Sequence, residues 1–504
     1  MKIILSPKTS YNRLKADTLV VPLFKGEKES AYALPAAIKK LVVSVIASKE
    51  FQGGAMETQL LYTGGKGVSR ICLLGLGEKK ECSLEFLTRA YGAAVMRAKK
   101  VKAKSVALVV REDAVKNTAS ADIAGAVALG ARIADYHTAH YKGKKKKELH
   151  RIAKATLVVT HVDRAAKDAV HRAEAIADGL DFVRYISDSP ANYATPQYLS
   201  DAAKEIAKKT LGLTVTVFDK KRIEKEKMGG LLAVAQGSQH EPRFVVCEYN
   251  GLRPGSGNNA RPIVLVGKGI TFDTGGISLK PWNKMEEMKF DMCGAAAVMA
   301  TVAVAAKLKL PVHVVGLAPI AENMPSHTAY KPGDVITISD GTTVEILSTD
   351  AEGRMVLADG LVYAKKYKPQ VVVDVATLTG AIVAALSDYA SGLFTRDDAI
   401  AGALERIGKE TGDRVWRMPM PKEWNDHLKS PVADLRQVPS VRLADATMGA
   451  LFLENFVDQK TPWVHLDIAG TAWKMEGYPH AEPGATGAAV RLLVAWLEEM
   501  GKKG

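Results

Sequence analysis

Two carboxylates and a guanidinium lie within five residues in the segment Thr349-Asp350-Ala351-Glu352-Gly353-Arg354. The segment separates a strand-like alternating run from a run with helical periodicity, and α/β enzymes keep their chemistry at such junctions. In an extended backbone, side chains two residues apart point to the same side, so Asp350 and Glu352 would reach a common cation. An isolated acidic pair is usually a solvated loop, so a metal site requires further ligands.

Further candidate ligands lie upstream. An apolar run ends at Lys268, and Asp273 follows it. The turn formers Gly275-Gly276 then let Lys280 point back toward the same place. A lysine that closes an apolar strand is better explained as paired or metal-bound than as a surface lysine, because a buried ammonium loses its hydration. As a metal ligand it would be a neutral amine. Asp291 precedes a helix-like run, so it could also be a carboxylate that stabilises a helix N-terminus.

Together these segments provide four carboxylates, two lysines and one arginine, enough to hold two cations beside a developing oxyanion. Two cations that share a water lower its pKa and hold both the attacking and the carbonyl oxygen. Lys280 and Arg354 would then neutralise the oxyanion. The sequence therefore predicts a hydrolytic centre with two metal ions. The ligand types are compatible with Zn²⁺, Mn²⁺, Co²⁺ or Mg²⁺.

Other catalytic patterns are missing from the sequence. There is no GxSxG, HExxH or phosphate-binding-loop motif, and the 11 histidines form no ligand-spaced cluster. His465 lies in an apolar run, so we expect it to be a hydrogen-bonded core residue.

The elements that position these residues are predicted after residue 190. There, continuous apolar runs alternate with longer helical segments, as expected for a sheet that is covered on both faces. Strands are predicted at 244–249, 263–267, 311–317, 343–348, 371–376 and 463–468, and helices at 197–209, 293–308, 353–367, 399–411, 447–459 and 485–500.

The first third of the chain predicts a separate small α/β domain. Its predicted strands are 18–23, 70–76, 105–110 and 156–160, and its predicted helices are 84–100 and 120–134. Residues 164–188 have the apolar spacing of a helix that connects two domains. The sequence therefore predicts an N-terminal domain at 1–163, a connecting helix within 164–190 and a C-terminal domain with a central mixed sheet at 191–504.

Positive charge is concentrated in the first third. Residues 1–165 contain 30 Lys+Arg and 14 Asp+Glu, a balance of +16, whereas residues 166–504 contain 39 and 41, a balance of −2; the two sum to the overall +14. Such a basic surface could bind nucleic acid or another polyanion, or could simply be a solvated face.

The remaining features indicate a cytoplasmic protein. The four cysteines are scattered without a CxxC pair, which fits a reducing compartment. The first residues contain too short an apolar run for a signal peptide, and no run approaches the length expected of a membrane span.

At residues 348–354 the chain resembles the leucyl aminopeptidase family, whose signature is Asn-Thr-Asp-Ala-Glu-Gly-Arg. This chain has Ser348 in the first place, a departure that affects only how tightly the Asp350 loop is braced. Further departures are Ser326-His327 and Ala446-Thr-Met-Gly. The other matching segments, in the family's order, are Lys268–Lys280, Asn323-Met-Pro, Lys331-Pro-Gly-Asp334, Ala376-Thr-Leu-Thr-Gly380, His465-Leu-Asp-Ile-Ala-Gly470 and Gly484-Ala-Thr-Gly487; Tyr141-Lys-Gly-Lys also resembles the family's Tyr-Lys-Ser-Lys segment.

The resemblance implies a ligand set for two divalent ions, Zn²⁺ or Mn²⁺. One ion would be held by Asp273, Asp350 and Glu352. The other would be held by Lys268, Asp273, Asp291 and Glu352. Lys280 and Arg354 would be catalytic without being ligands, with a bicarbonate ion at Arg354 serving as the base.

The resemblance also implies the substrate and the assembly. The substrates would be peptides with a free N-terminus, from which a metal-dependent aminopeptidase releases a leucine-like first residue. The enzyme would be a cytoplasmic homohexamer. The side-chain pocket would be formed by Met288, Thr377, Gly380 and Ala469, which could instead be ordinary core residues. The fold would be a small, macro-like α/β domain joined by a helix to the catalytic α/β domain. An alternative or additional function is DNA binding through the basic N-terminal domain, as in some members of the family.

Overall fold

The computed structural model describes residues 1–8, 14–27, 34, 36–64, 67–144, 149–252, 261–439, 441 and 444–502. The chain forms two compact units. The first comprises Met1–Asp181 together with Met475–Pro483, and the second comprises Phe182–Lys474 together with Gly484–Gly504. The boundary at residues 181 and 182 falls inside helix α4 (Arg164–Asp188), which covers the stretch where a connecting helix is predicted.

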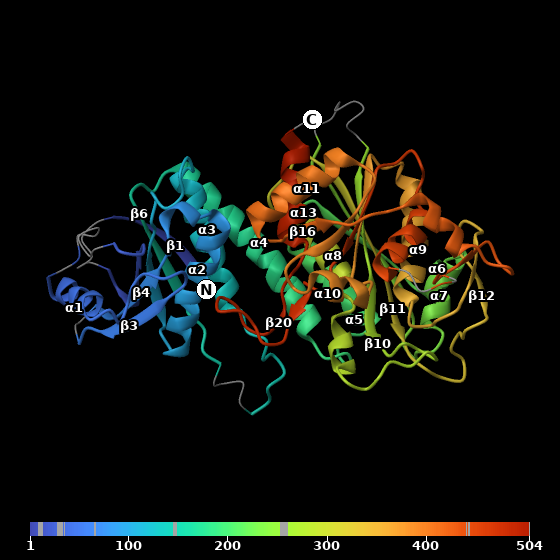
Figure 1. Cartoon of the computed structure of the whole chain (residues 1–504), viewed down its shortest axis with the longest axis horizontal. Helices are drawn as coiled ribbons and strands as arrows, with labels where there is room; N and C mark the ends of the chain where they lie inside the picture. Colours follow the sequence, from blue (N-terminus) through green and yellow to red (C-terminus); the bar gives the residue numbers. More distant parts are fainter. Residues whose placement is uncertain are drawn as a thin grey trace. The chain divides into compact units, whose positions relative to one another are not determined.

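The first unit is a six-stranded sheet with helices on both faces (Figure 1). Its order is β1-β6-β5-β2-β4-β3, and only the edge strand β3 runs antiparallel to its neighbour. Side chains of β2 alternate between two cores, with Val20 on the α2 side and Leu19 and Val21 on the α1 side. The strands are β1 (Lys2–Pro7), β2 (Ala16–Leu23), β3 (Thr58–Tyr62), β4 (Val68–Gly75), β5 (Ser105–Val109) and β6 (Lys154–Val159); the helices are α1 (Ala36–Ala47), η3 (Lys79–Glu81), α2 (Leu84–Lys100) and α3 (Ser120–Asp135).

The second unit contains a mixed, nine-stranded sheet in the order β16-β15-β18-β14-β9-β11-β8-β7, with β10 paired to β11. β18, β14, β9 and β11 run parallel, whereas β8 and β15 pair antiparallel to their inner neighbours. The strands are β7 (Leu213–Phe218), β8 (Arg243–Asn250), β9 (Ile263–Gly267), β10 (Gly269–Asp273), β11 (His313–Asn323), β14 (Val371–Ala376), β15 (Ser391–Phe394), β16 (Val415–Arg417) and β18 (Trp463–Asp467). One small sheet contains β12 (Val335–Thr337), β13 (Thr343–Glu345) and β17 (Leu435–Arg436). Another contains β19 (Trp473–Lys474) and β20 (Gly484–Ala485).

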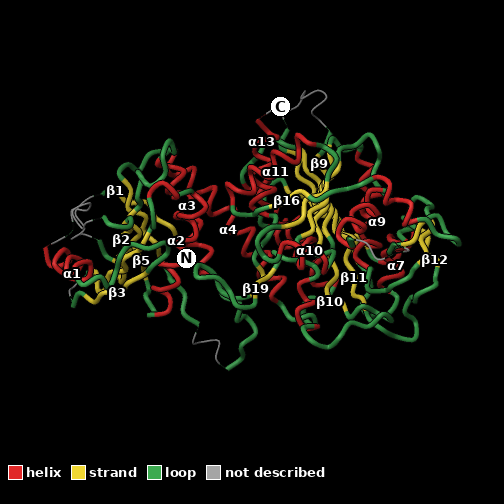
Figure 2. Tube along the Cα trace, in the orientation of Figure 1, coloured by secondary structure: helices red, strands yellow, loops and turns green. Residues whose placement is uncertain are grey.

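Helices cover the large sheet, and Figure 2 shows them on both of its sides. Several begin behind a side-chain cap: Ser83 caps α2, Thr195 caps α5, Thr379 caps α10 and Asp397 caps α11. The helices of the second unit are α5 (Pro196–Lys208), α6 (Lys220–Lys225), α7 (Gly229–Ala235), η6 (Met285–Phe290), α8 (Cys293–Lys307), α9 (Glu352–Ala364), η7 (Lys365–Tyr367), α10 (Gly380–Leu386), α11 (Asp398–Thr411), η8 (Lys422–Leu428), α12 (Asp445–Glu454) and α13 (Val490–Lys502). The predicted fold, a small α/β domain and a larger one with a mixed sheet, is confirmed.

One helical stretch, Met285–Lys307, is long and apolar enough to cross a membrane, contrary to the expectation that no run approaches that length. However, 89% of its most apolar window is buried inside the protein. Its main part, α8, packs against β8, β9, β11 and β14. A helix enclosed on all sides is apolar all round, which explains its composition.

Some elements differ from the sequence-based expectation. The sequence does not predict β7, β10 or β15, and the strand expected at 343–348 ends at Glu345. The helix expected from 485 begins only at Val490, because Gly484, Gly487 and Ala489 all have positive φ. The helix expected at 447–459 is α12, which begins at Asp445 and ends at Glu454.

Candidate metal centre

The candidate ligands gather where parallel strands of the large sheet end. Lys268 directly follows β9, and Asp273 is the last residue of β10. Asp291 lies between η6 and α8. Because β9, β14 and β18 run parallel, their carboxyl ends form one edge, the place where α/β sheets bind ligands.

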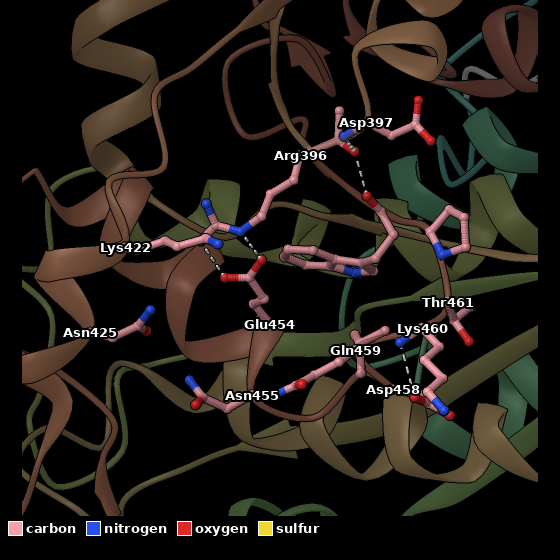
Figure 3. Close-up of a pocket in the computed structure, with 14 residues that line it drawn as sticks. Arg396, Asp397, Lys422, Asn425, Glu454, Asn455, Asp458, Gln459, Lys460 and Thr461 are labelled. Atoms are coloured by element: carbon pink, nitrogen blue, oxygen red, sulfur yellow. Dashed lines mark hydrogen bonds and ion pairs between the residues drawn. The ribbon is translucent and has the colours of Figure 1, made fainter.

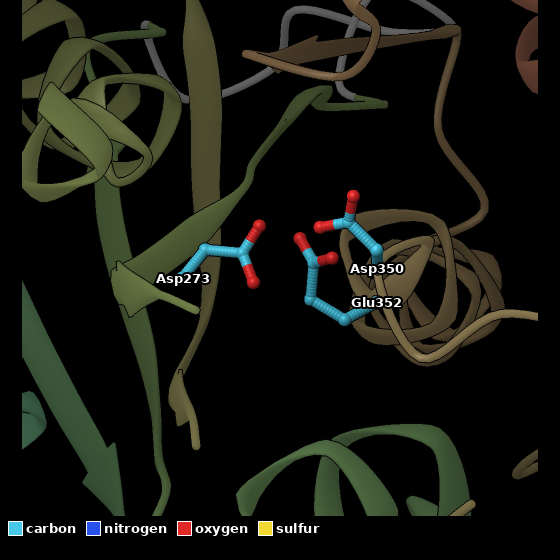
Figure 4. Close-up of side chains that lie close together, drawn as sticks. All are labelled: Asp273, Asp350 and Glu352. Carbon is cyan, nitrogen blue, oxygen red and sulfur yellow. The ribbon is translucent and has the colours of Figure 1, made fainter. Parts of the chain in front are cut away.

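Three carboxylates form the middle of the cluster. Asp273, Asp350 and Glu352 each offer one oxygen, and these oxygens lie within 4.8 Å of one another. Figure 4 shows Asp273 facing the other two side chains across a short gap. The expectation that an extended backbone aligns Asp350 with Glu352 is wrong, because Ala351 has φ −112° and ψ 38° and Glu352 is the first residue of α9.

Lys268 is buried within the cluster. Its Nζ lies 2.8 Å from Asp291 Oδ1 and 3.0 Å from Glu352 Oε1, and it donates a hydrogen bond to Thr377 O at 2.8 Å. Burial alone would lower the pKa of Lys268, but the charges of Asp291, Glu352 and Asp273 outweigh it and raise the pKa. Ligation through a neutral amine therefore requires a cation beside it that reverses this balance.

Lys280 places a second ammonium at the other side of the cluster. Its Nζ lies 2.8 Å from Asp273 Oδ2 and also contacts Asp350 Oδ1. Burial lowers the pKa of Lys280, but the charges of Asp273, Glu352 and Asp350 outweigh burial and raise the pKa above its ordinary value. The side chain is therefore an ammonium. This ammonium stands between two carboxylates, which is a position suited to a cation.

Asp291 is held by its neighbours through one oxygen only. Its Oδ1 accepts hydrogen bonds from Lys268 and, at 2.7 Å, from Thr377 Oγ1. Its Oδ2 is buried and has no hydrogen-bond partner in the described part of the chain. A buried carboxylate oxygen without a donor is costly, and a metal ion would satisfy it. The donor set therefore fits divalent cations.

The carboxylates are crowded together; Asp273, Asp291 and Glu352 are buried, whereas Asp350 is exposed. Burial, followed by the charge of Asp273, raises the pKa of Asp350 to about 6. Burial is also the main cause of the raised pKa values of Asp291 and Glu352. Carboxylates that raise one another's pKa in this way attract positive charge, so the cluster suits bound cations.

Arg354 lies in the first turn of α9 and is 6% exposed. Its Nη1 donates to Gln437 O at 2.5 Å, whereas its Nε has no hydrogen-bond partner among the described residues. Burial lowers the pKa of Arg354, opposed by the charges of Asp445, Glu352 and Asp467. A buried guanidinium with an unused donor can bind an anion.

Three of the four predicted pocket residues lie on segments that Asp467 joins by hydrogen bonds. Asp467, at the end of β18, accepts hydrogen bonds from Leu378 N, Thr379 Oγ1 and Ala469 N, which links the segment Thr377–Gly380 to Ala469. Thr377 is buried and is used by both Lys268 and Asp291, so it is more than a core residue. A Cβ on Gly380 would have no heavy atom within 4 Å, so the space beside it is open.

The fourth predicted pocket residue, Met288, lies in η6 and is partly exposed. Its carbonyl accepts a hydrogen bond from Asp291 N at 3.3 Å. This bond places Met288 one turn before a candidate ligand.

Sequence reasoning assigned no role to Thr349, which organises the loops around the cluster. Thr349 Oγ1 donates to Gly275 O at 2.6 Å and accepts from Ser278 N at 2.8 Å, while Thr349 N donates to Ser278 Oγ. The loop that carries Lys280 is therefore bonded to the residue that precedes Asp350. The position of Thr349 directly before the acidic motif could have suggested this role.

The twin glycines are more than turn formers. Gly275 and Gly276 have φ of +84° and +66°. A Cβ on Gly276 would lie 2.8 Å from Asn323 Oδ1 and 2.9 Å from Thr349 Oγ1. Only glycine combines this backbone conformation with so close an approach.

A separate hollow of about 790 Å³ lies at the other edge of the sheet (Figure 3). It is lined by Trp463, the first residue of β18, and by the ion pair of Arg396 with Glu454. Trp463 is four residues before Asp467, a separation of roughly 13 Å along the strand. This hollow contains none of the candidate ligands.

Comparison with known families agrees with the geometry. Residues 181–494 match the catalytic domain of the cytosol aminopeptidase family, and residues 20–145 match its N-terminal domain. The chain belongs to the cytosol aminopeptidase family. The predicted family and enzyme class are thereby confirmed: the protein is a hydrolase of the aminopeptidase type, in a family of metal-dependent enzymes.

Individual members of the family are similar along nearly the whole chain. A probable cytosol aminopeptidase of Burkholderia ambifaria is 42% identical over 487 residues, covering 96% of this chain and 95% of that protein. One from Ralstonia pickettii is 43% identical over 499 residues, covering 97% and 96%.

Solved structures show the same fold. The bottromycin maturation enzyme BotP has a TM-score of 0.84 and 34% identity, covering 97% of this chain and 100% of its own; it has also been solved in complex with Mn. A mutant of tomato leucine aminopeptidase has a TM-score of 0.85 and 29% identity, covering 99% and 96%.

Proposed function

We propose that the protein removes N-terminal amino acids from peptides at the carboxylate cluster, with two divalent ions. Asp273, Asp350 and Glu352 would hold one ion. The other would be held by Lys268, Asp273, Asp291 and Glu352. The convergence of three carboxylate oxygens within 4.8 Å is the observation that supports this assignment most directly. When bound, two such ions would polarise the scissile carbonyl and lower the pKa of the attacking water.

The chain's own residues would stabilise the charge that develops on the carbonyl oxygen. Lys280 and Arg354 are both positively charged and largely withdrawn from water, so their charge acts at low dielectric. A free N-terminal amine would be recognised in its neutral form, so an acylated peptide would be refused. The unused Nε of Arg354 is a donor for a bicarbonate ion that serves as base.

The substrate preference would be leucine-like. Gly380 leaves open space, and the other proposed pocket residues Met288 and Ala469 are apolar and partly exposed. An apolar pocket of this kind discriminates side-chain size by roughly tenfold to a few hundredfold.

Metal identity and assembly are part of the same proposal. Mn²⁺ or Zn²⁺ would be the working ion; Mn is the ion named for the BotP structure. The name that the relatives carry favours a cytoplasmic location, and the family resemblance favours a homohexamer. Lys145–Lys147, in a lysine-rich run of the basic N-terminal domain, lie outside the described residues, so the alternative of DNA binding rests on charge alone.

The test is turnover of leucine p-nitroanilide by protein stripped with a chelator and then reloaded with Mn²⁺ or Zn²⁺. We expect activity to be lost on stripping and to return as two ions per chain are bound, as measured by elemental analysis. N-acetyl-leucine p-nitroanilide serves as the control that must stay intact. Full activity in the stripped protein, or a maximum at one ion per chain, would contradict the two-metal assignment.

A further inference from the structure

Asn323 connects Asp273, one proposed metal ligand, to the loop that carries Asp350, another proposed ligand. It is the last residue of β11 and lies opposite Asp273 in the strand register. Its side chain is 1% exposed, and its Nδ2 donates to Asp273 Oδ1 at 2.8 Å and to Thr349 O at 3.0 Å. A carboxylate and a carbonyl can only accept, so both bonds require the amide nitrogen on this side.

The two oxygens of Asp273 are used differently. Oδ1 accepts from Asn323 Nδ2 and, at 2.9 Å, from Gly275 N. Oδ2 faces the cluster, where it contacts Lys280 Nζ. Asn323 therefore helps to fix the rotation of the carboxylate and so determines which oxygen faces the other ligands.

The main chain of Asn323 supports the same place. Its carbonyl accepts from Thr274 N at 3.1 Å and from Thr274 Oγ1 at 2.9 Å. Its side-chain Oδ1 is buried and has no hydrogen-bond partner among the described residues. The residue keeps a buried acceptor unsatisfied, which is costly, while its donor is committed to Asp273 and Thr349.

We propose that Asn323 is a positioning residue for the metal centre: it orients the Asp273 carboxylate and holds it in register with the Thr349-Asp350 loop. The inference rests on the proposed function, since it assigns Asp273 to the ions. Loss of a hydrogen-bonded partner behind a metal ligand typically weakens metal binding by 10- to 100-fold.

The test compares Asn323→Leu and Asn323→Ser with the matched control Tyr330→Phe. Tyr330 OH donates to Thr349 O at 3.0 Å, the same carbonyl that Asn323 uses. The control therefore loses a bond to the loop without removing a bond to Asp273. The readout is the Kd of the full-length, metal-free protein for Mn²⁺, measured by competition with a chelator, together with its thermal unfolding midpoint.

We expect both Asn323 variants to bind Mn²⁺ about 10- to 100-fold more weakly, with kcat recovering largely at saturating Mn²⁺. The Tyr330→Phe protein should bind Mn²⁺ within about threefold of the unchanged protein, even where its unfolding midpoint falls. Equal Kd values for the Asn323 variants and the unchanged protein, or equal losses in the control, would overturn the inference. Failure of both Asn323 variants to fold would assign the residue to fold stability and would overturn it as well.

This outcome is separable from the proposed function. If the unchanged protein binds Mn²⁺ but does not hydrolyse leucine p-nitroanilide, the peptidase proposal fails while the binding comparison still decides the role of Asn323.

Discussion

Lys280 is the residue whose proposed role separates catalysis from metal binding most clearly. It contacts Asp273 and Asp350 as an ammonium, and so it cannot be a ligand in that state. We expect Lys280→Ala to lower kcat by about a hundredfold or more, because one stabilising charge for the oxyanion is lost. Metal content should remain at two ions per chain by elemental analysis. Lys284→Ala, on the same loop and with a side chain 70% exposed, is the control that should leave kcat unchanged.

Gly353 makes room for Lys268. A Cβ at Gly353 would lie 2.4 Å from Cε and 2.6 Å from Nζ of Lys268. We expect Gly353→Ala to displace the ammonium from Asp291 and Glu352 and to reduce kcat/KM by at least about tenfold, because misplacement near a reacting centre is costly.

The control for that change is another helical glycine, Gly402 in α11, where a Cβ would meet nothing within 4 Å. Gly402→Ala should leave kcat/KM unchanged and stabilise the protein by about 0.5 to 1 kcal/mol in urea unfolding, through helix propensity alone. If Gly353→Ala behaved in the same way, the proposed packing of Lys268 would be wrong.

At the scale of elements, helices often end here on lysine where glycine would be favoured. Among the described residues, Lys102, Lys309 and Lys368 follow α2, α8 and η7 with φ of 55°, 53° and 48°. α11 instead ends on Gly412, with φ of 78°. The left-handed conformation costs a residue with a Cβ about 1 to 2 kcal/mol.

We therefore expect Lys309→Gly to raise the free energy of unfolding by about 1 kcal/mol, measured in urea. The matched change is Lys409→Gly inside the last turn of α11, where glycine should lower the free energy of unfolding by about 1 kcal/mol. A loss of stability in Lys309→Gly would show that its side chain contributes more than the backbone conformation costs.

The same scale shows what the sequence could predict. Long apolar runs such as β9 and β14, and helices with clear periodicity such as α2 and α5, were predicted close to their observed bounds. β15 was missed because Ser391–Phe394 is short and contains glycine, and β10 because a single lysine separates it from β9. Glu352 was predicted as a ligand, but in the wrong backbone conformation. The hydrogen bonds of Asn323 and Thr349 depend on segments distant in sequence, which no local pattern reveals.

At the scale of the whole molecule, the first unit includes a segment from near the end of the chain. Glu482, in Met475–Pro483, lies 2.9 Å from Lys99 Nζ and 3.3 Å from His137 Nδ1. Lys99 is 6% exposed and also donates to Ala134 O and Tyr136 O. Burial raises the pKa of Glu482, but the hydrogen bonds and charges of His137 and Lys99 outweigh it and lower the pKa to about 2.

A lowered pKa means that Glu482 stabilises the fold above its ordinary pKa of about 4.5, and that this contribution disappears as the pH falls toward 2. We expect Glu482→Gln to destabilise Met475–Pro483 by about 1 to 3 kcal/mol at pH 7. Hydrogen exchange in that segment measures the difference. The gap between the two proteins should narrow as the pH falls from 4.5 toward 2. A gap that stays unchanged over that range would show that the charge of Glu482 does not stabilise the segment.

The chain passes between the two units three times, once within α4 and again on either side of Met475–Pro483. A single proteolytic nick at the boundary in α4 would therefore leave Met475–Pro483, a part of the first unit, covalently attached to the second unit. A truncated gene that encodes only residues 1–181 would omit the partner of the buried Lys99 ammonium. The N-terminal domain therefore cannot be exchanged at a single junction. A chimaera that replaces it must replace Met475–Pro483 as well.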